Sequence, residues 1–207
     1  SDHCGTCVRC IEACPTGAIV EPYVVDSRLC ISYLTIELRG FIPRELRPLV
    51  GKRIYGCDDC QDVCPWNRFA KKSEEQAFLP REPLASMDLM AMLRMSRQEF
   101  QQATAGSATR RARFGGFLRN VAVALGNEGD RRAIPALVEA LSHEEPLVRG
   151  HAAWALGVLG DERARKPLGD RLFAENDSGV REELEWAIGE LGSSTRSAPP
   201  PRPKASS

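Results

Sequence analysis

The sequence lacks several features that define large protein classes. It has no run of the roughly 20 apolar residues that a membrane-spanning helix needs, and its first residues show neither the basic stretch nor the apolar core of a signal peptide. Lysine and arginine number 28, as do aspartate and glutamate, so the formal net charge is zero. These absences predict a cytoplasmic, monomeric protein with no membrane partner, in which nucleic-acid contacts would need a local basic patch.

Cysteine is also missing from most of the chain. All eight cysteines of the 207 residues lie between positions 4 and 64. Thiols stay reduced in the cytoplasm, and tight cysteine spacings there favour metal ligation over disulfides. Residues 107–192, in contrast, are rich in Ala, Leu, Glu and Arg. The change in composition predicts two structural units.

The cysteine spacing matches the ligand run of bacterial ferredoxins that hold two 4Fe-4S clusters. The first motif is Cys4-x2-Cys7-x2-Cys10-x3-Cys14-Pro15. The second, Cys57-x2-Cys60-x3-Cys64-Pro65, lacks one cysteine, and Cys30 is the only one left to replace it. In such runs three cysteines hold one cluster, while the one before proline reaches the other cluster.

Eight thiols therefore divide into two sets of four. We expect cluster one to be held by Cys4, Cys7, Cys10 and Cys64, and cluster two by Cys14, Cys30, Cys57 and Cys60. Zinc, which also takes four cysteines, is the alternative, but zinc sites seldom use three cysteines at two-residue steps followed by Cys-Pro. The pattern predicts an electron-transfer module.

The second half of the chain repeats itself. Similar tetrapeptides end at Gly126, Gly157 and Gly189, at a spacing of about 31 residues. Repeats of this length, with Pro135 and Pro167 at matching places, predict stacked helix pairs of the HEAT-like kind. Between the two units, the segment from Met87 to Met95 has helical spacing, and its methionines are expected to fill the core rather than to bind a soft metal.

The predicted fold is mainly α with small β content. It consists of a bacterial-ferredoxin-like two-cluster domain (1–67), a bridging helical segment (68–106), a HEAT-like α-solenoid (107–192) and a disordered tail (193–207), which is dominated by Ser and Pro.

Two segments resemble the epoxyqueuosine reductase family. They are Cys30-Ile-Ser-Tyr-Leu-Thr-Ile-Glu37 and Gly56-Cys-Asp-Asp-Cys-Gln-Asp-Val-Cys-Pro-Trp-Asn67, followed by the HEAT-like half. The resemblance implies a cobalamin-dependent iron-sulfur oxidoreductase that reduces epoxyqueuosine to queuosine in tRNA. Electrons would come from an external donor such as a flavodoxin or ferredoxin. The family carries an N-terminal domain that supplies most of the cobalamin pocket and the catalytic acid. The resemblance therefore implies that this chain is a C-terminal fragment, or a split gene product with a separate N-terminal half, and we assign no catalytic residue here.

The same resemblance places Ser32, Arg39 and Asp58 against the cobalamin. A purely structural interpretation remains open, in which Ser32 and Thr35 are loop hydrogen-bonders and Asp58 caps a helix.

For the tRNA, Arg110, Arg111 and Arg113 form the best local basic run, which continues to Arg119 with two phenylalanines between. Such a run could bind phosphates and stack a base, although a solvated helix face is the plainer interpretation. The main alternative function is a ferredoxin-type electron carrier fused to a protein-binding HEAT-like solenoid. A regulatory scaffold with structural clusters is a third.

Overall fold

The computed structural model of the chain describes residues 4–71, 73–76, 79 and 82–192. It is mainly helical with one small two-stranded sheet, which confirms the predicted fold class. The expected disordered tail (193–207) lies outside the described residues. Within the described part of the chain, no helix has both the length and the apolar character needed to cross a membrane.

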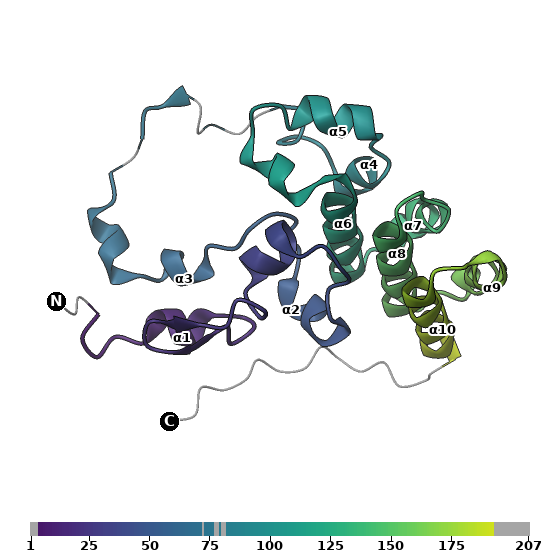
Figure 1. Ribbon diagram of the computed structural model, residues 1–207, viewed down its shortest axis with the longest axis horizontal. Coiled ribbons are helices and arrows are strands. Elements are labelled where there is room, and N and C mark those ends of the chain that lie inside the picture. The colour runs from purple at the N-terminus through teal and green to yellow at the C-terminus, as the bar shows by residue number, and fades with distance from the viewer. Residues whose placement is uncertain (1–3, 72, 77–78, 80–81, 193–207) are drawn as a thin grey trace.

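The cysteine-rich part is built from short elements (Figure 1). Helix α1 (Arg9–Ala13) leads to a hairpin of β1 (Ile19–Glu21) and β2 (Val24–Val25), in which Ile19 pairs with Val25. The elements that follow are the π-helix η1 (Tyr33–Glu37), the 3-10 turn η2 (Arg44–Leu46), and helices α2 (Arg47–Val50) and α3 (Asp59–Asp62), then the 3-10 turn η3 (Pro65–Phe69). The three valines of the hairpin, Val20, Val24 and Val25, are exposed, whereas Leu34 of η1, Leu46 of η2 and Val50 of α2 are buried.

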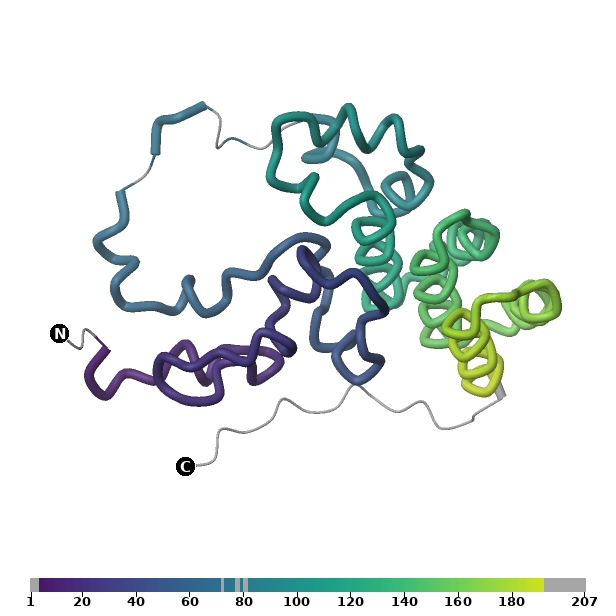
Figure 2. Tube along the Cα trace, in the orientation of Figure 1, coloured from purple at the N-terminus to yellow at the C-terminus, as the bar shows by residue number. Residues whose placement is uncertain are grey.

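The described part of the bridging segment contains two short helices. The described parts of the chain after η3 follow a wide arc before α4 (Leu89–Leu93) and α5 (Arg97–Ala103) (Figure 2). The Asp88 carboxylate caps α4, and Ser96 with Glu99 forms a capping box that starts α5. This box is a start signal that helical periodicity alone overlooks. Met92 and Met95 are buried, as expected of core residues.

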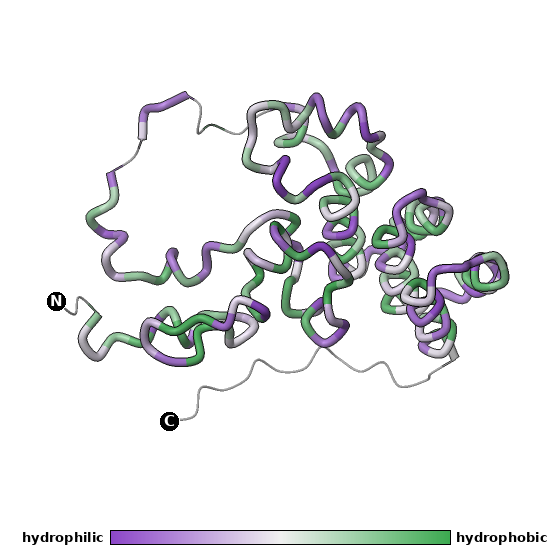
Figure 3. Tube along the Cα trace, viewed as in Figure 1, coloured by the Kyte–Doolittle hydropathy of each residue, from purple (hydrophilic) through white to green (hydrophobic). Residues whose placement is uncertain are grey.

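The solenoid consists of inner and outer helices. The inner helices α6 (Phe114–Glu128), α8 (Pro146–Leu159) and α10 (Ser178–Gly192) lie side by side, with α7 (Ile134–Ala140) and α9 (Arg165–Ala174) on their outer side (Figure 1). The 3-10 turns η5 (Ala108–Ala112), η6 (Arg131–Ala133) and η7 (Glu162–Ala164) precede α6, α7 and α9. Hydrophobic residues alternate with hydrophilic ones along these helices (Figure 3), and most of the core lies between them.

The repeated glycines let neighbouring inner helices approach closely. A Cβ added at Gly126 would lie 3.1 Å from the Ala155 backbone, and one added at Gly157 would lie 2.9 Å from the Ala187 backbone. At Gly189, where no further repeat follows in the described chain, an added Cβ would meet nothing within 4 Å. The glycine of each repeat is therefore needed where one inner helix packs against the next.

We predict that Gly157→Ala destabilises the solenoid by about 1 to 3 kcal/mol, because the added methyl group overpacks a helix contact formed by backbone. Gly189→Ala is the matched control, which should be neutral or should stabilise by up to about 1 kcal/mol through helix propensity. Urea denaturation followed by circular dichroism measures both. An equal effect of the two substitutions would contradict this account of the repeat.

Residues 41–47, here called the docking segment, join the cysteine-rich part to the solenoid. The Phe41 ring stacks on His151, with ring centroids 5.2 Å apart, and covers Gly150 and Gly179. Arg47, whose side chain is 1% exposed, forms a bidentate pair with Glu183 at 2.8 Å for both bonds. The docking segment therefore occupies the groove between α8 and α10.

His151 is neutral in this interface. Burial holds its pKa well below the ordinary value, with the nearby charges of Arg47 and Arg119 acting in the same direction. The ring Nδ1 lies 2.7 Å from the Leu147 carbonyl and Nε2 accepts the Ile42 amide at 3.2 Å, so the proton resides on Nδ1.

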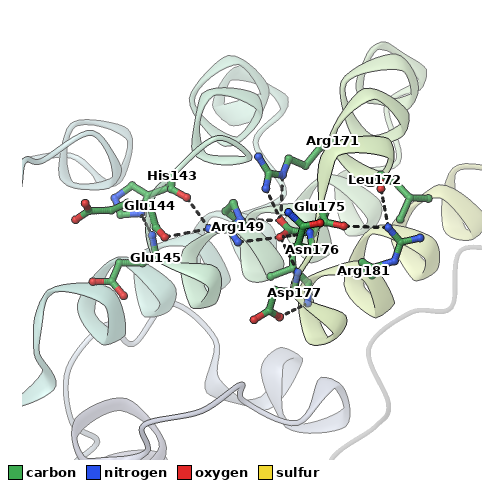
Figure 4. A network of polar contacts seen from close by, with 11 residues as sticks. His143, Glu144, Glu145, Arg149, Arg171, Leu172, Glu175, Asn176, Asp177 and Arg181 are labelled. Atoms are coloured by element: carbon green, nitrogen blue, oxygen red, sulfur yellow. Dashed lines mark hydrogen bonds and ion pairs between the residues drawn. The ribbon is translucent and has the colours of Figure 1, made fainter.

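A second buried ion pair joins two repeats (Figure 4). Arg149 donates to the Glu175 carboxylate at 2.8 and 2.9 Å and caps the carbonyls of His143 and Glu144. The Arg149 side chain is 10% exposed and that of Glu175 is 2% exposed, so the pair is internal. Burial raises the pKa of Glu175, but the hydrogen bonds from Arg149, the Asp177 amide and Arg171 outweigh it, so the pKa falls from 4.5 to about 2.

We predict that Glu175→Gln lowers the free energy of unfolding by about 3 kcal/mol near neutral pH. Because the folded-state pKa is depressed, the wild-type advantage is complete above the unfolded pKa and is lost as the pH falls toward about 2; near pH 3 it should be roughly half. Denaturant titrations at the two pH values measure it. The control is Glu185→Gln on α10, where the carboxylate is exposed and 3.9 Å from Arg181; it should change stability by less than about 1 kcal/mol.

Candidate metal centre

The two cysteine motifs adopt the same local structure. Cys10 and Cys60 are the second residues of α1 and α3, which pack against each other. Each helix ends shortly before a Cys-Pro step, where Cys14 (φ −66°, ψ 115°) and Cys64 (φ −68°, ψ 123°) are extended. Extended backbone is what a following proline imposes. Each of these two cysteines is thereby turned away from its own motif.

The structure brings together the four cysteines expected at cluster one. A cavity of about 240 Å³ is lined by Cys4, Cys7, Cys10 and Cys64, together with Pro65, Trp66, Arg68 and Phe69. Cys4 and Cys7 are exposed, so this cavity lies at the surface.

The shape of the cavity bears on which metal it fits. A zinc site draws its sulfurs to about 2.3 Å from one ion. Among the residues that the structure describes, no three Cys, His, Asp or Glu side chains converge on a single-ion site. The donor set is all thiolate and surrounds a volume larger than one ion. It fits a polyatomic iron-sulfur group better than zinc.

The cysteines expected at cluster two also lie near one another. Burial raises the pKa of Cys60, and the charges of Cys14, Cys30 and Cys10 raise it further, so these thiols lie within electrostatic range of Cys60. Cys57, on the turn before α3, likewise has a raised pKa, mainly through burial. All four of the expected ligands are partly buried, in contrast to the exposed Cys4 and Cys7.

Cys14 has a lowered pKa, which favours its thiolate form. Burial raises its pKa, but hydrogen bonds from the Thr16 hydroxyl and from the amides of Thr16, Ala18 and Ile19 outweigh burial and lower it overall. The Ala18 amide lies 3.2 Å from Sγ. Hydrogen bonds to cysteine sulfur stabilise the thiolate and tune the potential of an iron-sulfur cluster.

The loop that begins at Cys30 is tied to the loop that carries Cys57. The Ser32 hydroxyl accepts the Cys57 amide at 3.0 Å and donates to the Cys57 carbonyl at 3.2 Å. The Thr35 hydroxyl accepts the Gly56 amide at 3.0 Å, where Gly56 has a φ of +74° that favours glycine. The loop hydrogen-bonding role considered for Ser32 and Thr35 is therefore present.

Arg39 and Asp58 remain exposed near this loop. Asp58 stands at the N-terminal position of α3, but its carboxylate caps no backbone amide and instead accepts from the Gln61 side chain at 2.6 Å. The capping role considered for Asp58 is therefore wrong. Arg39 donates to the carbonyls of Ile36 and Arg111, each at 3.1 Å.

The predicted basic run divides into two parts. Arg110, Arg111 and Arg113 are exposed on η5 and the turn into α6. Arg111 pairs with Glu37 of the π-helix, and the Tyr55 hydroxyl donates to the Ala108 carbonyl at 2.6 Å, so this segment lies beside the Cys30 loop.

The rest of that run is not available to RNA. Phe114 and Phe117 pack around Phe100 in the core, with ring centroids 5.8 and 5.3 Å from it, so neither can stack on a base. Arg119 is 1% exposed and donates to backbone carbonyls. Outside the run, Arg44 pairs with Glu183, Lys52 with Glu128 and Arg53 with Asp59.

Sequence reasoning missed Asn120, which follows Arg119 and is 0% exposed. Its side chain donates to the carbonyls of Thr35 and Ile54 at 2.7 and 2.9 Å. A polar pair inside a helix that is otherwise apolar from Phe114 to Gly126 is the signal that could have revealed it.

Comparisons with known proteins agree with this geometry. Residues 3–67 match the family model of the 4Fe-4S double cluster binding domain, and residues 104–189 match that of HEAT repeats. The chain is similar to epoxyqueuosine reductases of Shigella dysenteriae (55% identical over 162 residues, 78% of this chain and 43% of that protein) and of Escherichia coli (54% identical over 162 residues, 78% and 43%). The chain thus spans less than half the length of these curated relatives.

Solved structures show the same likeness. A crystal structure of epoxyqueuosine reductase with a tRNA-Tyr epoxyqueuosine-modified stem loop superimposes with a TM-score of 0.82 at 34% identity, over 93% of this chain and 52% of that chain.

We predict that Cys30→Ala removes cluster two and leaves cluster one. Anaerobic reconstitution should give about eight irons in the wild type and about four in the variant, measured by iron analysis and electron paramagnetic resonance. Cys64→Ala is the matched control, because it should remove the signal of cluster one instead. If Cys30→Ala retains both signals, Cys30 is not a ligand.

Proposed function

The chain belongs to the epoxyqueuosine reductase family, and we propose that it is the electron-relay and tRNA-binding portion of such an oxidoreductase. The cavity lined by Cys4, Cys7, Cys10 and Cys64, with the second cysteine set beside it, is the observation that carries the proposal. The chain covers about half the length of its relatives. In this proposal, turnover would also require the rest of such an enzyme, which would supply the catalytic acid.

In this proposal all eight cysteines are ligands. Cluster one is held by Cys4, Cys7, Cys10 and Cys64, and cluster two by Cys14, Cys30, Cys57 and Cys60. The clusters supply one-electron transfer when bound. Exposure of Cys4 and Cys7 makes cluster one the entry point for an external donor of the flavodoxin or ferredoxin kind, and partial burial of the second set suits cluster two to an inner position.

The residues around the Cys30 loop suit a cobalamin surface. The exposed Arg39 guanidinium and Asp58 carboxylate offer a hydrogen-bond donor and an acceptor, as the amide-bearing edge of a corrin needs. Ser32 lies between the two cluster-two loops and shapes that surface through its bonds to Cys57. Cobalamin supplies the two-electron reduction chemistry when bound.

We further propose that Arg110, Arg111 and Arg113 bind tRNA phosphates. They are exposed and lie next to the π-helix that follows Cys30, and a relative has been solved with a tRNA stem loop. A tRNA substrate would place the protein in the cytoplasm. We also propose a monomer with three parts: the cluster domain (residues 1–67), the bridge (68–106) and the solenoid (107–192).

One observation weighs against the alternative of an electron carrier with a protein-binding solenoid. The docking segment already fills the groove between α8 and α10 through Phe41 and the Arg47–Glu183 pair. That inner surface serves an internal contact.

We predict that replacing Arg110, Arg111 and Arg113 together by alanine weakens binding to an epoxyqueuosine-modified anticodon stem loop. The slope of log affinity against log salt should fall by roughly one for each arginine that contacts phosphate. Fluorescence anisotropy at several salt concentrations measures it.

The matched control is the triple alanine variant of Arg163, Arg165 and Lys166, which removes three exposed positive charges from another edge of the solenoid. It should leave the slope unchanged. Unaltered binding by the first variant, or an equal loss in the second, would reject this patch as the RNA site.

A further inference from the structure

Two polar residues on the first turns of α6 are fully enclosed. Arg119 is 1% exposed and Asn120 is 0% exposed, and both face the segments that carry Cys30 and Cys57. Burying a guanidinium is costly unless its hydrogen bonds are satisfied. The hydrogen-bond partners of Arg119 and Asn120 therefore indicate the role of these two residues.

Arg119 closes the end of the π-helix. It donates to the carbonyls of Leu34 at 2.6 Å, Leu38 at 3.0 Å and Gly40 at 2.7 Å. The last carbonyls of a helix have no partner within it, and a positive charge there is favourable. Burial lowers the pKa of Arg119 to about 10, so the side chain stays charged at neutral pH.

Asn120 bridges the two segments that carry cluster-two ligands. Its amide nitrogen donates to the Thr35 carbonyl at 2.7 Å, five residues after Cys30, and to the Ile54 carbonyl at 2.9 Å, three residues before Cys57. Its oxygen accepts from Arg119 at 3.0 and 2.9 Å. Both donor hydrogens and the acceptor oxygen are therefore used, which fixes the side chain in one orientation.

Further hydrogen bonds extend this bridge to the ligands. The Thr35 hydroxyl accepts from Gly56 and the Ser32 hydroxyl binds both backbone groups of Cys57. A continuous set of hydrogen bonds thus runs from α6 to the Cys57 backbone and holds it against the loop that starts at Cys30.

We propose that Arg119 and Asn120 are positioning residues for cluster two, which fix the separation of Cys30 from Cys57 and thereby set the reduction potential of that cluster. The proposal rests on the ligand assignment of the proposed function. Potential depends on hydrogen bonds to the sulfurs and on solvent access, and both change if the two loops separate. Cluster one has no ligand on the Cys30 loop and should be unaffected.

The test compares Asn120→Ala with Asn127→Ala. Asn127 lies two turns further along α6 and also donates to two carbonyls, those of Arg47 at 2.7 Å and Gly51 at 2.8 Å, on a segment without ligands. Neither substitution changes the net charge, and each removes two hydrogen bonds that the asparagine donates to backbone carbonyls; Asn120→Ala also removes the two that Asn120 accepts from Arg119. The midpoint potential of each cluster is measured by redox titration with electron paramagnetic resonance on the whole chain, without RNA or cobalamin.

We expect Asn120→Ala to shift the potential and the signal shape of cluster two while cluster one keeps both, and Asn127→Ala to leave both clusters unchanged. If Asn120→Ala does not fold, Arg119→Lys, which keeps the charge but cannot span three carbonyls, should give the same selective shift. An unshifted cluster two, or an equal shift in Asn127→Ala, overturns the proposal. The measured potentials do not depend on whether the chain binds RNA. A wild-type chain that holds only one cluster would instead overturn the ligand assignment of the proposed function.

Discussion

Three buried arginines hold segments of the molecule together by donating to backbone carbonyls and, in two cases, to a carboxylate far along the chain. Arg47 binds the Ile42 carbonyl and the Glu183 carboxylate. Arg149 binds the carbonyls of His143 and Glu144 and the Glu175 carboxylate. Arg119 binds three backbone carbonyls and the Asn120 side-chain oxygen, but no carboxylate. Removing a guanidinium from water costs several kcal/mol, so each arginine stabilises one arrangement of its partners and no other. No buried side-chain nitrogen or oxygen in the described residues lacks a partner. Of the three, Arg119 is the one that binds the segment following Cys30, through the carbonyls of Leu34 and Leu38.

The parts that the sequence predicted are those with local or periodic causes. Ligand spacing followed by Cys-Pro determines a loop shape, and glycine at every repeat determines how closely helices pack, so both could be read without a structure. The arginines of positions 110–119 show the limit. They form one basic run in the sequence, yet the first three are exposed and Arg119 is inside, because a helix turns its residues toward different neighbours. The apolar surroundings of Arg119 within α6 carried the information, but its carbonyl partners lie about 80 positions away along the chain.

The solenoid acts here as a scaffold for its own chain. Phe41 fits over Gly150, where an added Cβ would collide with the ring, and over Gly179, where it would lie 3.1 Å from the ring. The Arg47–Glu183 pair and the neutral His151 then complete a contact with no unpaired charge. Repeat proteins usually offer such grooves to partners, and a groove already filled leaves the outer surfaces and the ends of the repeats for other contacts. The exposed arginines of η5 are at one such end.

Helix α6 joins this end to the cysteine loops. Arg113 has φ 60° and ψ 163°, a conformation that glycine adopts readily and that costs another residue about 1 to 3 kcal/mol. It persists because both of its backbone groups are engaged, the amide with the Arg110 carbonyl at 3.1 Å and the carbonyl with the Phe117 amide at 2.9 Å. The strained turn sends α6 inward immediately after the exposed arginines, so that Arg119 and Asn120 reach the π-helix within two turns. A helix is stiff over that length, so α6 fixes the distance and orientation between the exposed arginines and the loops of Cys30 and Cys57. A phosphate bound at Arg113 would therefore have a defined position relative to these two cysteines.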